Sequence, residues 1–132
     1  MIIPISIVIP FYQNESGIFV WTQIRKSKDE LNGLLEFPGG KVEASESPAL
    51  AAVREVKEEV EVDIKEGDLL KFKNYSSEVS GKTILLMVFL YEDKEGHFVH
   101  SGYVKLNELA NMGDRIPPAN KEILLDLKDH FC

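Results

Sequence analysis

The chain has little of what disulfide-rich, membrane and nucleic-acid-binding proteins depend on. Among its 132 residues there is one cysteine, Cys132, so no internal disulfide can form and a reducing, cytoplasmic location is expected. The longest apolar run, Ile84–Tyr91, is too short to cross a bilayer, and the apolar opening MIIPISIVIP lacks the basic start of a signal peptide. Basic residues (15) are outnumbered by acidic ones (22), and the net charge of -7 argues against stable DNA binding or adhesion to an anionic membrane.

The composition itself is that of a globular protein. Hydrophobic residues make up 44% of the chain and charged residues 28%, and the length suits one core. We therefore expect a single domain over residues 1–132.

Apolar segments separated by turn-forming residues predict both strands and helices. Strands are expected at 2–12, 18–22, 69–77, 83–91 and 102–106, and helices at 48–60, at 107–112 and from Pro117 onward. The turn sequence QNESG joins the first two strands into a hairpin, while residues 25–33 form a loop. Pro4 and Pro10 are expected to limit the pairing of the first strand. This mixture predicts an α/β (α+β) fold, with helices packed against a mixed sheet.

The segment 48–60 carries the clearest helix signal. Ser47 can cap the helix and Pro48 suits its first position. One apolar stripe should be buried, and a group of glutamates falls on another side of the helix. The stripe consists of Ala49, Ala52, Val53, Val56 and Val60, and the glutamates are Glu55, Glu58 and Glu59.

Three glutamates at this spacing repel one another by a few tenths of a kcal/mol per pair. A solvated acidic face is the ordinary explanation. The alternative is a site for a hard divalent cation, because Mg²⁺ takes oxygen ligands from carboxylates, water and substrate phosphates. The upstream Pro38-Gly39-Gly40 supports the second explanation, since bare glycine backbone offers carbonyl oxygens at close range.

The wider spacing resembles the Nudix box, G-x5-E-x7-R-E-U-x-E-E-x-G-U, where U is apolar. The matching residues are Gly40, Glu46, Arg54, Glu55, Val56, Glu58, Glu59 and Val62. The segments LEFPGGK (35–41) and PPANKEILLDLK (117–128) are similar to the MutT branch of this family. The resemblance implies a Nudix α/β/α sandwich with a mixed β-sheet, in which the box forms a loop-helix-loop motif.

The resemblance also implies an activity. Members of the MutT branch are metal-dependent pyrophosphohydrolases that cleave a nucleoside 5′-triphosphate to the monophosphate and pyrophosphate. A guanine-type substrate such as 8-oxo-dGTP is expected here. The alternative substrate is a 5′-triphosphorylated RNA end, for which Lys71, Lys73, Lys82 and Lys94 would supply a basic rim. A Nudix-like binding module without catalysis is a third hypothesis, but it predicts the loss of a box carboxylate.

Residue roles follow from the same resemblance. Glu55, Glu58, Glu59 and the Gly39 carbonyl would bind Mg²⁺, or alternatively Mn²⁺. Glu58 and Glu59 would also act in catalysis, with Arg54 and Glu46 pairing to orient the helix. Phe37, Gly40, Lys41 and Asn120 would contact the substrate, with Asn120 at a purine edge and Phe37 along the base. Phe37 could instead fill the core, and Asn120 could instead form a turn or cap a helix.

Two points stay open in the sequence. The general base could be a box glutamate, or Glu92 or Glu95 in the later loop, with His97 and His100 as weaker candidates. The late glycine of the box is Glu61 here. A positive φ at a glutamate costs roughly 1 kcal/mol, so an altered helix exit is expected.

Overall fold

The computed structural model describes residues 1–131, so Cys132 lies outside the described residues. The elements, in chain order, are β1 (Ile2–Asn14), β2 (Gly17–Trp21), β3 (Gln23–Ile24), β4 (Leu35–Glu36), β5 (Gly39–Lys41), α1 (Pro48–Val60), β6 (Leu69–Val79), β7 (Lys82–Glu92), β8 (Tyr103–Lys105), α2 (Leu106–Ala110) and α3 (Pro118–Phe131). The predicted strands, helices and 25–33 loop are confirmed. Within the described part of the chain, no helix is both long and apolar enough to cross a membrane.

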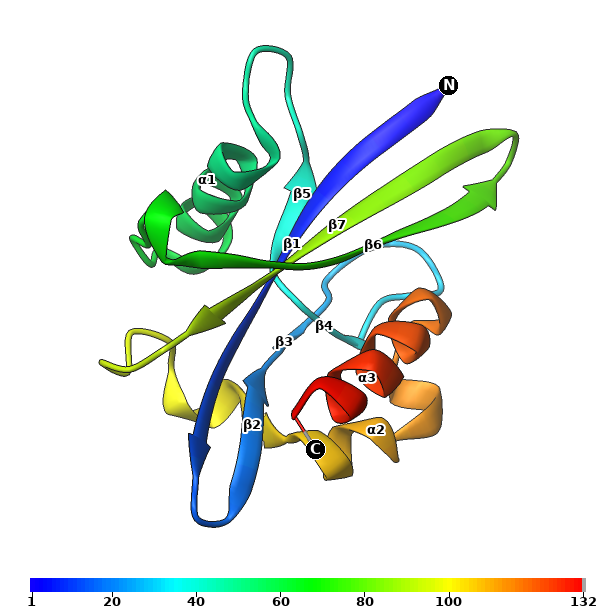
Figure 1. Cartoon of the computed structure of the whole chain (residues 1–132). Helices are drawn as coiled ribbons and strands as arrows, with labels where there is room; N and C mark the ends of the chain where they lie inside the picture. Colours follow the sequence, from blue (N-terminus) through cyan, green and yellow to red (C-terminus); the bar gives the residue numbers. More distant parts are fainter. Residues whose placement is uncertain (132) are drawn as a thin grey trace.

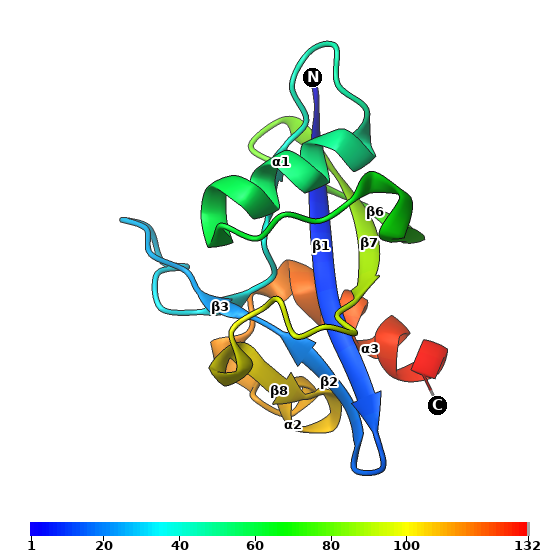
Figure 2. The same ribbon diagram turned by 90° about the vertical axis from the view of Figure 1, so that its left-hand side faces the viewer.

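The sheet is mixed, as predicted. Its order is β6-β7-β1-β2-β8, with β5 also paired to β1, and β3 and β4 form a separate two-stranded ribbon. The β1–β7 pair is parallel, whereas the other pairs are antiparallel. Helix α1 lies on one side of this sheet and α2 and α3 lie on the other (Figures 1 and 2). The predicted helix–sheet–helix architecture is therefore confirmed.

The expectation that Pro4 and Pro10 limit the pairing of the first strand is confirmed on one edge of β1 and wrong on the other. Toward β5 and β2, the paired residues are 5–7 and 11–14, which leaves both prolines out. Strand β1 lies in the middle of the sheet and pairs with β7 from Ile2 to Phe11. The backbone amide of Asp93, which follows β7, donates to the Phe11 carbonyl at 2.8 Å. The backbone N–H and carbonyl groups of the odd-numbered residues of β1 therefore point toward β7, and those of the even-numbered residues point away from it. Both prolines therefore direct their missing N–H away from β7, and neither removes a bond from the long parallel pair.

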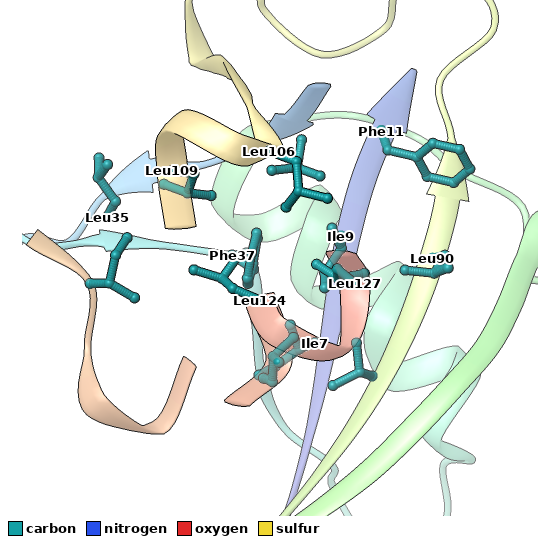
Figure 3. Packing of buried hydrophobic residues seen from close by; sticks show 14 of the residues in the cluster. Ile7, Ile9, Phe11, Leu35, Phe37, Leu90, Leu106, Leu109, Leu124 and Leu127 are labelled. Carbon is teal, nitrogen blue, oxygen red and sulfur yellow. The ribbon is translucent and has the colours of Figure 1, made fainter. Parts of the chain in front are cut away.

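Alternation along β1 divides the core into two clusters, one on each face of the sheet. Ile7 and Ile9 pack with Leu109, Leu124 and other side chains of α2 and α3 (Figure 3). On the opposite face, Val8 packs with residues of α1 and with Trp21 and Phe98. This second cluster comprises Val8, Trp21, Ala52, Val56, Ile64, Phe89, Tyr91 and Phe98.

Helix α1 begins and packs as its sequence indicates. The Leu50 amide donates to the Ser47 side chain at 3.1 Å, which confirms the N-cap, and Pro48 is the first helical residue. Ala52 and Val56 are fully buried, as is Ala51, which the stripe did not include. Burying a side chain such as that of Val56 stabilises the fold by roughly 1.5–3 kcal/mol. This packing fixes α1 on the sheet and determines where its acidic side points.

Candidate active site

The glycines before α1 are required by close approach. In the antiparallel β1–β5 pair, Val8 donates to the Pro38 carbonyl at 2.9 Å, so the backbone groups of the neighbouring Gly39 face away from β1. A Cβ at Gly39 would overlap the backbone of Ser6, and a Cβ at Gly40 would overlap the carboxyl group of Glu55. The two glycines therefore bring bare backbone against the acidic side of α1.

Arg54 is the centre of the charged cluster on α1. Its Nε and Nη2 donate to the two carboxylate oxygens of Glu46 at 3.1 and 2.6 Å, which is a bidentate pair. Nη2 also donates to the Lys41 carbonyl at 3.0 Å, while Nη1 donates to Glu55 at 2.9 Å and to Glu58 at 3.2 Å. One guanidinium thus ties the loop before the helix to two of the three glutamates.

The ionic character of this pair is reinforced by its surroundings. Hydrogen bonds from Arg54 and from the Glu43 amide lower the pKa of Glu46 below its ordinary value. The hydrogen bond to Glu46 in turn raises the pKa of Arg54. Both groups are therefore charged at neutral pH, and the expected Arg54–Glu46 contact is present. Its role in orienting catalytic groups stays a prediction.

Glu59 is held differently from the other two glutamates. Its Oε2 accepts from the Gly39 amide at 3.0 Å and from Gln23 Nε2 at 3.2 Å. Partial burial of the carboxyl group raises the pKa of Glu59 above its ordinary value, although the residue as a whole is exposed, and the negative charge of Glu55 adds to this rise. A positive charge beside Glu59 would relieve both effects.

The donor set suits a hard divalent cation, but the carboxylates do not converge in this structure. Among residues 1–131, no group of three or more acidic, histidine or cysteine side chains is arranged to hold a metal ion. The reason is visible in the contacts, because Glu55 and Glu58 turn to Arg54 while Glu59 turns to Gly39. The three residues are spaced i, i+3 and i+4 on α1, so their side chains share one side of the helix, with Glu55 against Gly40 and Glu59 against Gly39. The residues therefore fit the ion.

The expected alteration of the helix exit is not observed. Glu61 adopts the left-handed conformation, with φ 58° and ψ 31°, and its amide donates to the Lys57 carbonyl at 3.1 Å. A glycine would adopt this conformation without strain. The exit therefore keeps the geometry that a glycine favours, and the strain is carried at Glu61.

Comparison with known proteins decides the family. The NUDIX domain family matches residues 3–125 of the chain. The chain belongs to the Nudix family. Nudix hydrolases generally use divalent metal ions.

Two curated relatives and one solved structure show the range of similarity. An 8-oxo-dGTP diphosphatase of Escherichia coli K12 is 31% identical over 127 residues, covering 94% of this chain and 96% of that protein. A CTP pyrophosphohydrolase of the same organism is 38% identical over 72 residues, covering 54% and 52%. A structure from a study of MutT from Aliivibrio salmonicida and Vibrio cholerae superposes with a TM-score of 0.69 at 29% identity, covering 95% and 94%. The similarity therefore extends beyond the box to nearly the whole chain.

The predicted substrate residues of this Nudix chain fall in different surroundings. Phe37 is 7% exposed and lies in the core cluster beside Leu124 (Figure 3), so its burial supports the core-filling alternative. Asn120 is buried in the first turn of α3, and its backbone N–H donates to the Pro117 carbonyl at 2.9 Å. Lys41 is exposed at the end of β5, and Arg54 binds its carbonyl. Contact of these residues with a base or phosphate stays a prediction.

The loop after β7 does not bring its acidic residues to the box. Glu92 pairs with Lys94 at 3.8 Å and Glu95 with His97 at 3.2 Å. They line a hollow of about 800 Å³, together with His97, His100 and residues of β1, and α1 contributes none of its lining. In this conformation the box glutamates are the better-placed candidates for a general base.

Sequence reasoning missed Asp93, which organises that loop. It is 4% exposed and accepts hydrogen bonds from the amides of His97 and Phe98, at 2.8 and 3.1 Å, and from the Tyr103 hydroxyl at 2.6 Å. Burial and the bond to Asp93 raise the pKa of Tyr103, so its hydroxyl stays a donor at neutral pH. The sequence signal was a single aspartate at the end of an apolar strand, which is too common to single out.

A second hollow, of about 590 Å³, opens beside the box between β3 and the segment before β8. Gln23, the donor to Glu59, lines it, so this hollow adjoins the carboxylate cluster. Its wall includes Ile24 and Val99, which are 57% and 68% exposed, and the cations Lys26 and Arg115. Neither cation has an ion-pair partner among the described residues.

Proposed function

We propose that this Nudix protein is a nucleoside triphosphate pyrophosphohydrolase that yields the nucleoside monophosphate and pyrophosphate. A guanine nucleotide, including 8-oxo-dGTP, is the expected substrate, because the full-length relative in Escherichia coli bears the name 8-oxo-dGTP diphosphatase. The observation that carries the proposal is the complete set of box carboxylates on α1, with Glu55 and Glu58 bound by Arg54 and Glu59 bound by the Gly39 amide. A binding module without catalysis would have no need of the full set.

The proposed metal is Mg²⁺, with Mn²⁺ as a substitute. Glu55, Glu58, Glu59 and the Gly39 carbonyl would hold it. When bound, such an ion neutralises phosphate oxygens and makes a bound water more acidic. The chain's own negative cluster could not otherwise accept a triphosphate.

The residues around the ion have separate tasks. Glu58 or Glu59 removes a proton from the attacking water, whose oxygen forms the new bond to the β-phosphorus as the bond to the α-phosphate bridging oxygen breaks. Arg54, fixed by its bidentate contact with Glu46, orients the carboxylates. Arg54 also pairs with Glu55 and Glu58, whose carboxylates would have to leave it to bind an ion.

The remaining predicted residues would bind the substrate itself. Lys41 would contact phosphate, and the Gly40 backbone would let a phosphate approach. Asn120 would hydrogen-bond the base edge, and Phe37 would border the base from the core side.

The RNA alternative keeps one specific observation in its favour. The four lysines proposed as a rim are not gathered in one place, since Lys71 and Lys73 line one hollow and Lys94 lines others. Lys26 and Arg115, in contrast, both line the hollow beside Glu59. Two cations there suit a substrate with a further phosphate beyond its first nucleoside, as a 5′-triphosphorylated RNA end has.

The test is hydrolysis of 8-oxo-dGTP, dGTP and a 5′-triphosphorylated RNA by wild type and Glu58→Gln, with Mg²⁺ and with Mn²⁺. We expect fast release of pyrophosphate from the nucleotides by wild type and a loss of at least two orders of magnitude in E58Q. Glu61→Gln is the matched control, because Glu61 follows the same helix but does not contact Arg54. If only the RNA is hydrolysed, the substrate is a 5′-triphosphorylated RNA end and not a nucleotide. If no substrate is hydrolysed, the proposed activity is wrong.

A further inference from the structure

Gln23 is the one uncharged side chain that donates a hydrogen bond to the carboxylate cluster among the described residues. It belongs to β3, pairs in register with Glu36 of β4, and reaches Glu59 of α1 with its amide nitrogen at 3.2 Å. The strand is fixed on its other side, where the Thr22 amide donates to the Gly102 carbonyl at 2.9 Å. The amide of Gln23 is thus held in place by the backbone on both sides of it.

The two donors to Glu59 fall on the same oxygen. Both Gly39 N–H and Gln23 Nε2 donate to Oε2. Oε1 receives no hydrogen bond from the described residues. A carboxylate fixed through one oxygen by two donors has a defined orientation, and its other oxygen remains available to a ligand.

An amide has an advantage over a charged donor at this position. Lysine or arginine would add a positive charge that competes with a bound dication for Glu59 and repels it. Glutamine donates through an N–H without adding charge. The choice of residue therefore fits a carboxylate that must stay both oriented and free to bind a cation.

We propose that Gln23 is a positioning residue for the metal site: it fixes Glu59 through Oε2 so that Oε1 is presented to the divalent ion. This inference rests on the proposed function, in which Glu59 is a metal ligand. It further predicts that Gln23 acts on metal affinity and not on substrate affinity.

The experiment measures Mn²⁺ binding to the nucleotide-free protein by electron paramagnetic resonance. Gln23→Met keeps the length of the side chain and removes the donor, and Gln23→Ala removes the side chain altogether. Both should bind Mn²⁺ about 10–100-fold more weakly than wild type, the usual effect of removing a residue that orients a metal ligand. Gln13→Met, at the chain's other glutamine, should bind Mn²⁺ as wild type does, and all variants should keep the wild-type thermal midpoint. At saturating Mn²⁺, kcat and the nucleotide KM of Q23M should return to wild-type values.

Glu59→Gln, measured in parallel, separates the possible failures. If E59Q loses Mn²⁺ affinity while Q23M and Q23A keep it, Gln23 has no positioning role and the proposed function stands. If E59Q binds Mn²⁺ as tightly as wild type, Glu59 is not a ligand, and both the ligand set and this inference are overturned.

Discussion

The left-handed residue at the end of α1 allows a stability change to be worked out before it is measured. Glu61 has φ 58°, where an L-residue is strained by roughly 1–2 kcal/mol and glycine is not. Glycine loses more conformational freedom on folding, by roughly 0.5–1 kcal/mol relative to alanine. Glu61→Gly should therefore stabilise the protein by about 0.5–1 kcal/mol relative to Glu61→Ala. For a chain of this length, that corresponds to a rise of about 2–4 °C in Tm.

Alanine is the matched comparison because it removes the Glu61 carboxylate but keeps a Cβ in the left-handed conformation. E61A should itself gain a few tenths of a kcal/mol, since a negative charge at a helix C-terminus is unfavourable. Urea denaturation followed by circular dichroism measures both differences, and the activity assay checks that the site is unchanged. If E61G is no more stable than E61A, the positive φ costs no more than the conformational freedom that glycine loses, and the account of a strained helix exit is refuted.

Three further changes test separate parts of the site. Gly40→Ala places a methyl group against the Glu55 carboxylate, so kcat/KM should fall at least about tenfold with the fold retained. An unchanged kcat/KM would show that Glu55 can move away from the methyl group without loss of activity. Arg54 lowers the pKa of Glu46, so the ion pair stabilises the fold fully above the ordinary pKa of 4.5, and this stability is lost as the pH falls through the lowered value. The free energy of unfolding of Glu46→Gln should therefore lie below that of wild type at neutral pH and approach it in acid. A difference between the two proteins that does not change with pH would contradict the ionic pair. Asp93→Asn weakens three hydrogen bonds in a buried position and should cost about 1–3 kcal/mol in urea denaturation, whereas a loss below 0.5 kcal/mol, roughly that of a surface substitution, would show that the loop does not depend on it.

Elements with a strong local signal were predicted well from the sequence. The cap at Ser47, the proline at the first helical position and the valine stripe gave α1 its observed limits, Pro48–Val60. The resemblance to the Nudix box also implied the contact between Arg54 and Glu46 across the loop, which the structure contains. These features depend on neighbours along the chain, so one sequence contains them.

Features that depend on the arrangement of the sheet were not predictable in the same way. Strands β3 and β4 have two residues each, too few for a periodic pattern, yet their pairing delivers Gln23 to Glu59. Pro10 is tolerated in a central strand because its missing N–H points away from β7, which cannot be known before the neighbouring strands are placed. The burial of Phe37 likewise depends on α3 covering that face of the sheet.

The central claim is that the glutamates of α1 bind a divalent ion together with the substrate's phosphates. The most direct measurement is a crystal structure of the protein soaked with Mn²⁺ and a non-hydrolysable dGTP analogue, with the ion located by anomalous scattering. We expect at least one Mn²⁺ between the analogue's phosphates and Glu55, Glu58 or Glu59, with Glu58 released from Arg54. An ordered analogue with no Mn²⁺ at these carboxylates would contradict the account.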